Sequence, residues 1–279
     1  MGYKIVVDSG CEITEDMRAA ADIAIVPLTL EIGTETITDD GAMSQQEIIT
    51  RIAAASNCPK TACPSPEAYA DKYAGEADRV YVVTLSAALS GSYASANVAK
   101  AMYEEEHPEA QVYVFNSRSA SVGETLIVRR IMELEAEGLS FEEVIAETEV
   151  YIDGMKTYFV LDNLETLRKN GRLSGLKALA ANMLQIKPIC VSTADGQIEQ
   201  IDQARGIKRA VEKMAAYVAK AQDTTGRRRF GISHCNALDR AHAIRERLMM
   251  HVRSGEAVFA ETGGLSTVYA NDGGIIMAI

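Results

Sequence analysis

The sequence lacks the signatures of several common activities. None of the patterns G-x-G-x-x-G, G-x-x-x-x-G-K-[ST], G-x-S-x-G or H-E-x-x-H occurs in its 279 residues, so dinucleotide, P-loop, hydrolase-elbow and zincin chemistry have no sequence support. Its five cysteines are odd in number and form no C-x-x-C pair, which disfavours both a disulfide framework and a zinc site. We therefore expect reduced thiols, no cofactor and no metal.

Long apolar runs and an excess of positive charge are also missing. No apolar stretch reaches membrane-spanning length, and Met1-Gly2-Tyr3-Lys4 opens no signal-peptide pattern, so we expect a cytoplasmic protein that is not an integral membrane protein. The formal charge of −11 repels nucleic acid and anionic membrane surfaces. The one basic cluster, Arg227–Arg229, follows Thr-Thr-Gly and indicates a solvated turn. Nucleic acid is not an expected partner.

The residues that are present predict a two-domain α/β protein. Hydrophobic residues make up 47% of the chain, which is enough for a large core, and the length exceeds that of one ordinary domain. Up to about residue 150, apolar runs alternate with amphipathic helical stretches, a pattern typical of βα units around a mainly parallel sheet. We assign residues 1–154 to such a domain with flanking helices, and residues 155–279 to a mixed α/β sheet domain.

Local signals mark where individual elements begin and end. Ser44 with Glu47 and Ser140 with Glu143 are capping boxes, and Ser65 caps a helix whose first residue is a proline. Periodicity predicts a helix over 119–137 and an apolar helix near 176–184. The segment 194–197 predicts a hairpin between two strands.

Four short segments place small hydroxyl side chains at expected strand ends and helix starts, where ligands bind in open α/β sheets. Hydroxyls and free backbone N–H groups form a neutral cradle for a carboxylate or phosphate, although serine and threonine also cap helices in a purely structural role. The candidate ligand-binding residues in these segments are Ser9, Thr61, Ser90, Gly91, Ser92 and Ser117.

Six motifs in order along the chain resemble the DegV family. They begin at Asp8 (DSGCEIT), Lys60 (KTACPSPEAY), Leu85 (LSAALSGSYASA), Asn116 (NSRSASVGE), Leu164 (LETLRKNGRLSG) and Gln185 (QIKPI). The resemblance extends over essentially the whole chain. It implies two α/β domains with a long-chain fatty acid buried in a cleft between them, and a ligand carboxylate that meets Thr61 and Ser90.

The resemblance also implies a partner. Some members serve as the acyl-binding subunit of a fatty acid kinase, in which a separate ATP-binding protein phosphorylates the carboxylate to supply acyl phosphate for phospholipid synthesis. Arg172 corresponds to the arginine of the family's G-G-R-I-S motif, with Asn170 replacing a glycine. Tyr269 stands where the family often has a histidine, and a tyrosine hydroxyl can still donate a hydrogen bond to a ligand. We expect a non-catalytic lipid-binding protein.

The chain of a fatty acid would need an apolar tunnel. Candidate linings are the helix that carries Val122, Leu126, Ile127 and Ile131, and the stretch 178–186. For any single one of these residues, the sequence alone favours ordinary core packing.

Two other functions remain open from the residues alone. The hydroxyl segments could hold a non-lipid anion such as a sugar phosphate, as in a sensor protein. Ser9 or Ser90, with His234 as base and Asp8 as orienting group, could form a hydrolase site.

Overall fold

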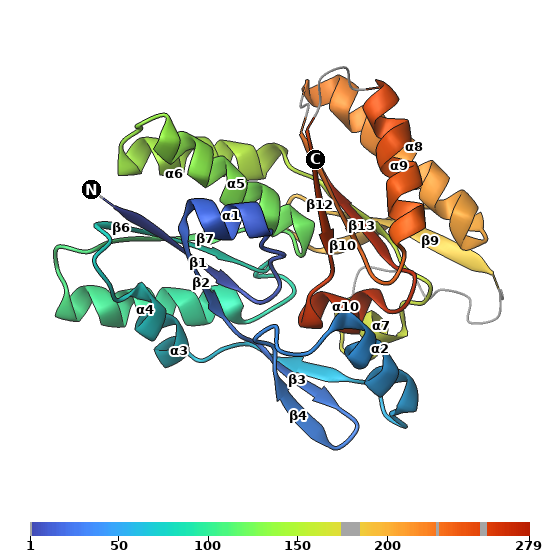
Figure 1. Cartoon of the computed structure of the whole chain (residues 1–279), viewed down its shortest axis with the longest axis horizontal. Helices are drawn as coiled ribbons and strands as arrows, with labels where there is room; N and C mark the ends of the chain where they lie inside the picture. The colour runs from blue at the N-terminus through green and yellow to red at the C-terminus, as the bar shows by residue number, and fades with distance from the viewer. Residues whose placement is uncertain (1, 174–184, 227–228, 252–255) are drawn as a thin grey trace.

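The computed structural model describes residues 2–173, 185–226, 229–251 and 256–279, and within these ranges the chain folds into three β-sheets with helices packed around them. Two of the sheets form the cores of two lobes that lie side by side, as Figure 1 shows. The expected class, α/β with an N-terminal parallel sheet and a C-terminal mixed sheet, is confirmed. The expected helix near 176–184 lies outside the described residues.

The N-terminal sheet is fully parallel, in the order β2-β1-β6-β7. Side chains alternate across it, so that Ile5 and Val7 pack under helices α5 and α6 while Val6 and Val82 pack against α3 and α4. Both faces are therefore buried. The elements of this lobe are β1 (Tyr3–Asp8), α1 (Glu15–Ala20), β2 (Asp22–Val26), α3 (Pro66–Tyr73), β6 (Arg79–Thr84), α4 (Ser92–Glu106), β7 (Gln111–Asn116), α5 (Val122–Ala136) and α6 (Phe141–Gly154).

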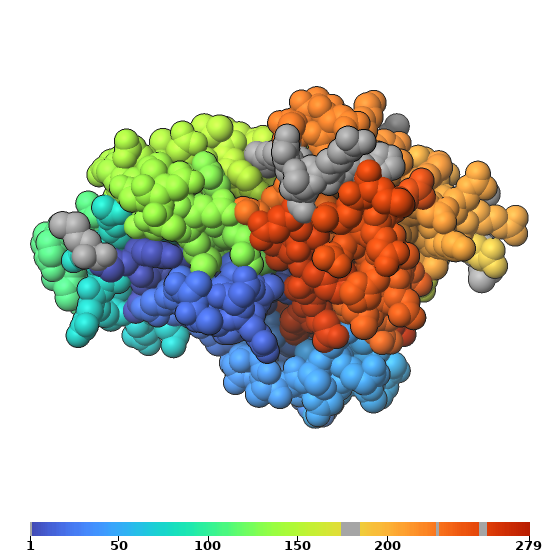
Figure 2. Space-filling view, turned by 45° about the horizontal axis from the view of Figure 1, so that its top comes forward, coloured from blue at the N-terminus to red at the C-terminus, as the bar shows by residue number. Residues whose placement is uncertain are grey.

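A small antiparallel sheet was not predicted. It has the order β4-β3-β5 and consists of β3 (Thr29–Ile32), β4 (Glu35–Thr38) and β5 (Lys60–Ala62), with α2 (Gln45–Ala54) between the last two strands. Its apolar side chains pack with Leu265 and Val268 of α10 (Gly264–Ala270). Figure 2 shows this blue part of the chain beneath the orange and red C-terminal part. A segment from before residue 154 thus packs on the C-terminal lobe.

The C-terminal sheet is mixed, in the order β10-β9-β8-β13-β11-β12, and only β11 and β12 are parallel. One face packs under α8 and α9 through Tyr158, Val160 and their neighbours. The opposite face carries Phe159 and Leu161. Its elements are β8 (Thr157–Val160), α7 (Glu165–Lys169), β9 (Ile186–Ser192), β10 (Ile198–Arg205), α8 (Ile207–Thr225), β11 (Phe230–His234), α9 (Leu238–His251), β12 (Ala257–Glu261) and β13 (Ile275–Ala278).

The predicted capping boxes and the predicted hairpin are found where the sequence placed them. Both capping boxes form, at Ser44 and at Ser140, and the segment 194–197 joins β9 to β10 as an antiparallel hairpin. Of the basic cluster, Arg229 pairs with Glu133 and Glu256, so it bridges the lobes and is not a solvated turn residue. The other two arginines lie outside the described residues.

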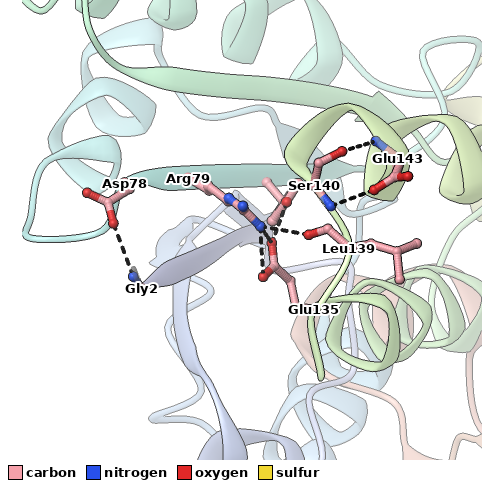
Figure 3. A network of polar contacts seen from close by, with 8 residues as sticks. Gly2, Asp78, Arg79, Glu135, Leu139, Ser140 and Glu143 are labelled. Carbon is pink, nitrogen blue, oxygen red and sulfur yellow. Dashed lines mark hydrogen bonds and ion pairs between the residues drawn. The ribbon is translucent and has the colours of Figure 1, made fainter. Parts of the chain in front are cut away.

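A polar network fastens α5 and α6 to the start of β6 (Figure 3). The guanidinium of Arg79 donates to the carboxylate of Glu135 at 3.0 Å and to the carbonyl of Leu139 at 3.0 Å. The Ser140–Glu143 capping box begins the next helix immediately after this contact. The turn between the two helices is therefore held to the edge of the parallel sheet.

Three carboxyl groups are buried where β1 ends. Asp8 accepts hydrogen bonds from the N–H groups of Gly10 at 3.0 Å and Leu85 at 2.8 Å. Glu12 accepts one from the N–H of Gly263 at 3.4 Å, and the oxygens of Glu124 have no hydrogen-bond partner among the described residues. Asp8 thus ties the strand end to the loop after β6, and Glu12 ties the N-terminal lobe to α10.

Burial makes these carboxyls hard to ionise. It raises the pKa of Asp8 to about 6 and that of Glu12 to about 7. Burial, followed by the charges of Asp8 and Glu12, raises the pKa of Glu124 well above its ordinary value. None of the causes acting on the three groups is a cation, so protonation of Glu124 is what relieves its repulsion by Asp8 and Glu12.

The raised pKa values predict that the folded state weakens as the pH rises. All three pKa values exceed their unfolded values, so their contribution to stability is complete below about pH 4 and is lost as the pH rises through 6 and 7. Each pKa unit corresponds to about 1.4 kcal/mol. We expect urea denaturation to show a lower unfolding free energy at pH 8 than at pH 5.5, and Glu124→Gln to reduce this difference. Glu142→Gln, at an exposed position, is the control, and an unchanged pH dependence in Glu124→Gln would contradict the assignment.

Candidate functional site

A cavity of about 350 Å³ lies between the lobes. It is bounded on one side by the face of the C-terminal sheet that carries Phe159 and Leu161, and on the other by loops that follow β2, β6 and β7. Most of its lining is apolar, and the large side chains that form it are Leu28, Leu85, Leu89, Phe159, Leu161, Leu167, Ile198, Leu265 and Ile276. The cavity therefore suits an elongated apolar ligand.

Hydroxyl groups gather at one end of this cavity. Thr61 lies on β5, where it pairs with Leu30, and its Oγ1 is 2.9 Å from the Oη of Tyr269 on α10. Ser90 and Gly91 lie alongside, since a Cβ on Gly91 would come within 2.8 Å of the Sγ of Cys63, two residues after Thr61. The structure thus brings together a strand, a helix and a loop that are far apart in the sequence.

The Ser90 loop is held in place from several sides. The N–H of Ser90 donates to the carbonyl of Ser86 at 3.0 Å, and the hydroxyl of Ser86 donates to the carbonyl of Gly196 in the β9–β10 turn at 2.8 Å. Arg172 lines the cavity and donates through Nε to the carbonyl of Leu89 at 3.1 Å. Because these bonds fix the loop, the Ser90 hydroxyl needs little reorganisation to meet a ligand.

Five of the eight predicted site residues line the cavity, namely Thr61, Ser90, Gly91, Arg172 and Tyr269. The other three are not among the lining residues. Ser9 accepts from the N–H of Leu28 at 3.0 Å, Ser92 pairs with Ser90 at 3.0 Å, and Ser117 donates to the carbonyl of Ser119 at 3.2 Å. Their hydroxyls form hydrogen bonds within the chain that stabilise the loops around the cavity.

His234 does not join a catalytic arrangement. It is 1% exposed, its Nδ1 accepts from the N–H of Ala237, and burial lowers its pKa. Asp8 binds backbone N–H groups and not His234, and within the described ranges no hydrogen bond joins His234 to Ser9 or Ser90. The geometry gives no support to a hydrolase.

The helix proposed as a tunnel wall packs elsewhere. Val122 and Leu126 contact Val258 and Ala278, while Ile127 and Ile131 fill the core beneath the parallel sheet. Core packing, the structural alternative, accounts for all four. Most of the stretch 178–186 lies outside the described residues.

Sequence reasoning missed the residues that line the other end of the cavity. Ser119, Thr157 and Ser192 all belong to the lining. Thr157, Phe159 and Leu161 alternate along β8 and the residue that follows it, and this period-2 pattern could have placed all three on one face. Only the fold shows that this face is turned away from α8 and α9.

No helix among the described residues is both long and apolar enough to cross a membrane. They contain no group of three or more histidine, cysteine, aspartate or glutamate side chains placed to hold a metal ion.

Known proteins match this chain over nearly its full length. A 48% identical structure from Ruminococcus gnavus, a DegV family protein refined with vaccenic acid, has a TM-score of 0.94 and covers 99% of each chain. The fatty acid kinase B3 protein of Streptococcus pneumoniae, loaded with linoleic acid, is 30% identical with a TM-score of 0.88, covering 100% of this chain and 99% of that one. A DegV domain-containing protein of Streptococcus gordonii is 34% identical over 99% of this chain and 98% of its own length.

A match to a family model agrees with these similarities and with the six sequence motifs. The family model described as "Uncharacterised protein, DegV family" matches residues 3–278. The chain therefore belongs to the DegV family.

Proposed function

We propose that this protein binds one long-chain fatty acid in the cavity between its lobes, with the carboxylate at Thr61, Ser90 and Tyr269. The observation that carries the proposal is a largely apolar cavity with hydroxyl groups gathered at one end. Relatives of the same fold support it, since the Ruminococcus gnavus and Streptococcus pneumoniae proteins hold vaccenic and linoleic acid.

The two ends of such a ligand would contribute differently to binding. Each buried methylene contributes about 0.8 kcal/mol, so the chain supplies most of the affinity. Hydrogen bonds to the carboxylate then fix its orientation. Neutral hydroxyls avoid the desolvation cost of a fully buried ion pair. Arg172 is half-buried at the same end, where its guanidinium can approach the carboxylate from the cavity edge.

The first experiment is denaturing mass spectrometry of an organic extract from freshly purified protein. A near-stoichiometric fatty acid is the expected result, because a fully desolvated tail leaves slowly. A protein that carries no lipid, or one that carries a phosphorylated polar ligand, would favour the alternative of a non-lipid anion-binding or sensor protein.

We further propose that the protein is not itself an enzyme and presents its fatty acid to a separate ATP-dependent kinase subunit in the cytoplasm. The likeness to the fatty acid kinase B3 protein supports a kinase partner, and five unpaired cysteines suit a reducing compartment. Tyr269 bonds Thr61 at the carboxylate end, so it orients the head group in a position where a histidine is common in the family. Any acid–base role of that histidine does not transfer to a tyrosine.

Removing the head-group hydroxyls should weaken fatty-acid retention. A hydrogen bond to a charged group contributes about 1.5–3 kcal/mol, so Thr61→Val combined with Ser90→Ala should lower the affinity at least tenfold. The measurement is lipid occupancy by extraction, with oleic acid titrated into delipidated protein. Thr36→Val with Ser95→Ala, outside the cavity lining, is the matched control. Equal occupancy in the two double variants would rule out the head-group role.

Arg172 should matter more for phosphorylation than for loading. Its Nη1 donates to the carbonyl of Asn170 at 2.5 Å and its Nε to that of Leu89, which leaves Nη2 to meet a transferred phosphoryl group. We expect Arg172→Gln to retain fatty acid within about threefold and to lose at least tenfold in acyl phosphate formation with the cognate kinase subunit. Arg168→Gln, an exposed arginine nearby, is the control. Parallel losses in loading and phosphorylation would show that Arg172 only shapes the cavity.

A further inference from the structure

The cavity has a second polar group far from the carboxylate end. Thr157 and Phe159 on β8, and Leu161 just after it, all line the cavity, as alternation along an extended segment requires. Leu161 belongs to the apolar cluster that includes Leu167 and packs against Tyr269. Thr157 lies four residues before Leu161, or about 13 Å away at 3.3 Å per residue. Thr157 therefore lies beside the acyl chain of a bound ligand and not beside its head group.

Two more hydroxyls adjoin Thr157. Ser192 is its neighbour on β9, and the N–H of Thr157 donates to the Ser192 Oγ at 3.0 Å. Ser119, from the loop after β7, reaches across the lobe boundary to the Oγ1 of Thr157 at 2.5 Å. All three residues line the cavity, so hydroxyls from both lobes form one polar patch inside an otherwise apolar wall.

The hydrogen bonds of this patch are incomplete. Ser119 shares a hydrogen bond with Thr157 and also donates to the carbonyl of Ala120 at 3.4 Å, and both side chains are at most 5% exposed. The Ser192 oxygen only accepts, and its own proton has no acceptor within the described part of the chain. A plain hydrocarbon chain would leave this donor facing methylenes, and an unmade hydrogen bond in an apolar setting is costly.

We propose that the cavity prefers a fatty acid that carries a hydroxyl group on the distal part of its chain. Ser192 donates to the oxygen of that hydroxyl, and the ligand's proton goes to a free lone pair of Thr157 or Ser119. This inference rests on the proposed function, since it names the kind of fatty acid that the same cavity takes. The apolar wall between the two polar groups, Phe159 with Ile198 and Ile276, contacts the unsubstituted part of the chain.

The test is a competition. Delipidated full-length protein is mixed with equal amounts of stearic acid and one of its mid-chain or distal hydroxy isomers, and the bound acids are extracted and counted by mass spectrometry. A net hydrogen bond contributes about 0.5–1.5 kcal/mol, so we expect the best isomer to be enriched by about twofold to twelvefold.

Two variants assign the preference to the patch. Ser192→Ala and Thr157→Val should each bring the ratio close to one while stearic acid still loads. Thr157→Val keeps the backbone bond to Ser192, so it serves if Ser192→Ala fails to fold. Ser95→Ala on α4, outside the lining, should behave as wild type.

The outcomes separate the two proposals. Loading of stearic acid with no preference for any hydroxy isomer overturns this inference and leaves fatty-acid binding intact. A preference that both variants retain overturns the assignment to these hydroxyls. Loading of neither acid overturns the proposed function and this inference with it.

Discussion

The arrangement of this protein depends on how the C-terminal sheet buries its two faces. Helices α8 and α9 cover the face that carries Tyr158 and Val160, whereas α5 covers the opposite face mainly over β11, β12 and β13 and does not pack around Phe159 and Leu161. Apolar side chains on that face must still be removed from water, because exposed hydrophobic area costs about 25 cal/mol per Å². Loops of the N-terminal lobe, α10 and the small antiparallel sheet cover it incompletely. The cavity is the space that this cover leaves.

Polar groups are placed at the edges of the same face. The loops after β1, β6 and β7 start from the carboxyl ends of parallel strands, which gather at one edge of their sheet. The buried Asp8 carboxylate fixes the position of the loop after β6 by accepting from Leu85. The hydroxyl groups at this end of the cavity belong to Thr61, Ser90 and Tyr269, and the described part of the chain places no lysine in the cavity lining. A carboxylate at this end would be met by hydroxyl dipoles, with the half-buried Arg172 at the cavity edge.

This arrangement also relates the chain to its family. The apolar cavity and the hydroxyl end fit relatives that hold vaccenic or linoleic acid. Tyr269 and the Ser119–Thr157–Ser192 patch are features of this chain's own cavity, and both place hydroxyls where they shape what binds. The head group would be set by Thr61 with Tyr269, and the choice among acyl chains by the far end of the wall.

The sequence alone determined the parts that depend on short-range patterns. Apolar runs predicted β1, β6, β7 and β8, the S-x-x-E pairs located two helix starts, and six motifs indicated the family together with Thr61, Ser90 and Arg172. It did not predict the antiparallel sheet of β3, β4 and β5, whose strands of three or four residues are too short for a clear period. Its boundary at residue 154 also gave no sign that residues before it pack on α10.

Only the tertiary structure decided which side chains meet. Thr61 and Tyr269 are 208 positions apart in the sequence, yet they form one hydrogen bond, and Ser119 finds Thr157 across the lobe boundary. No periodicity within one element specifies such contacts, because they depend on how two sheets pack against each other. The sequence therefore determined the elements and the hydroxyl-rich loops, while packing decided which hydroxyls face the cavity and which only support its walls.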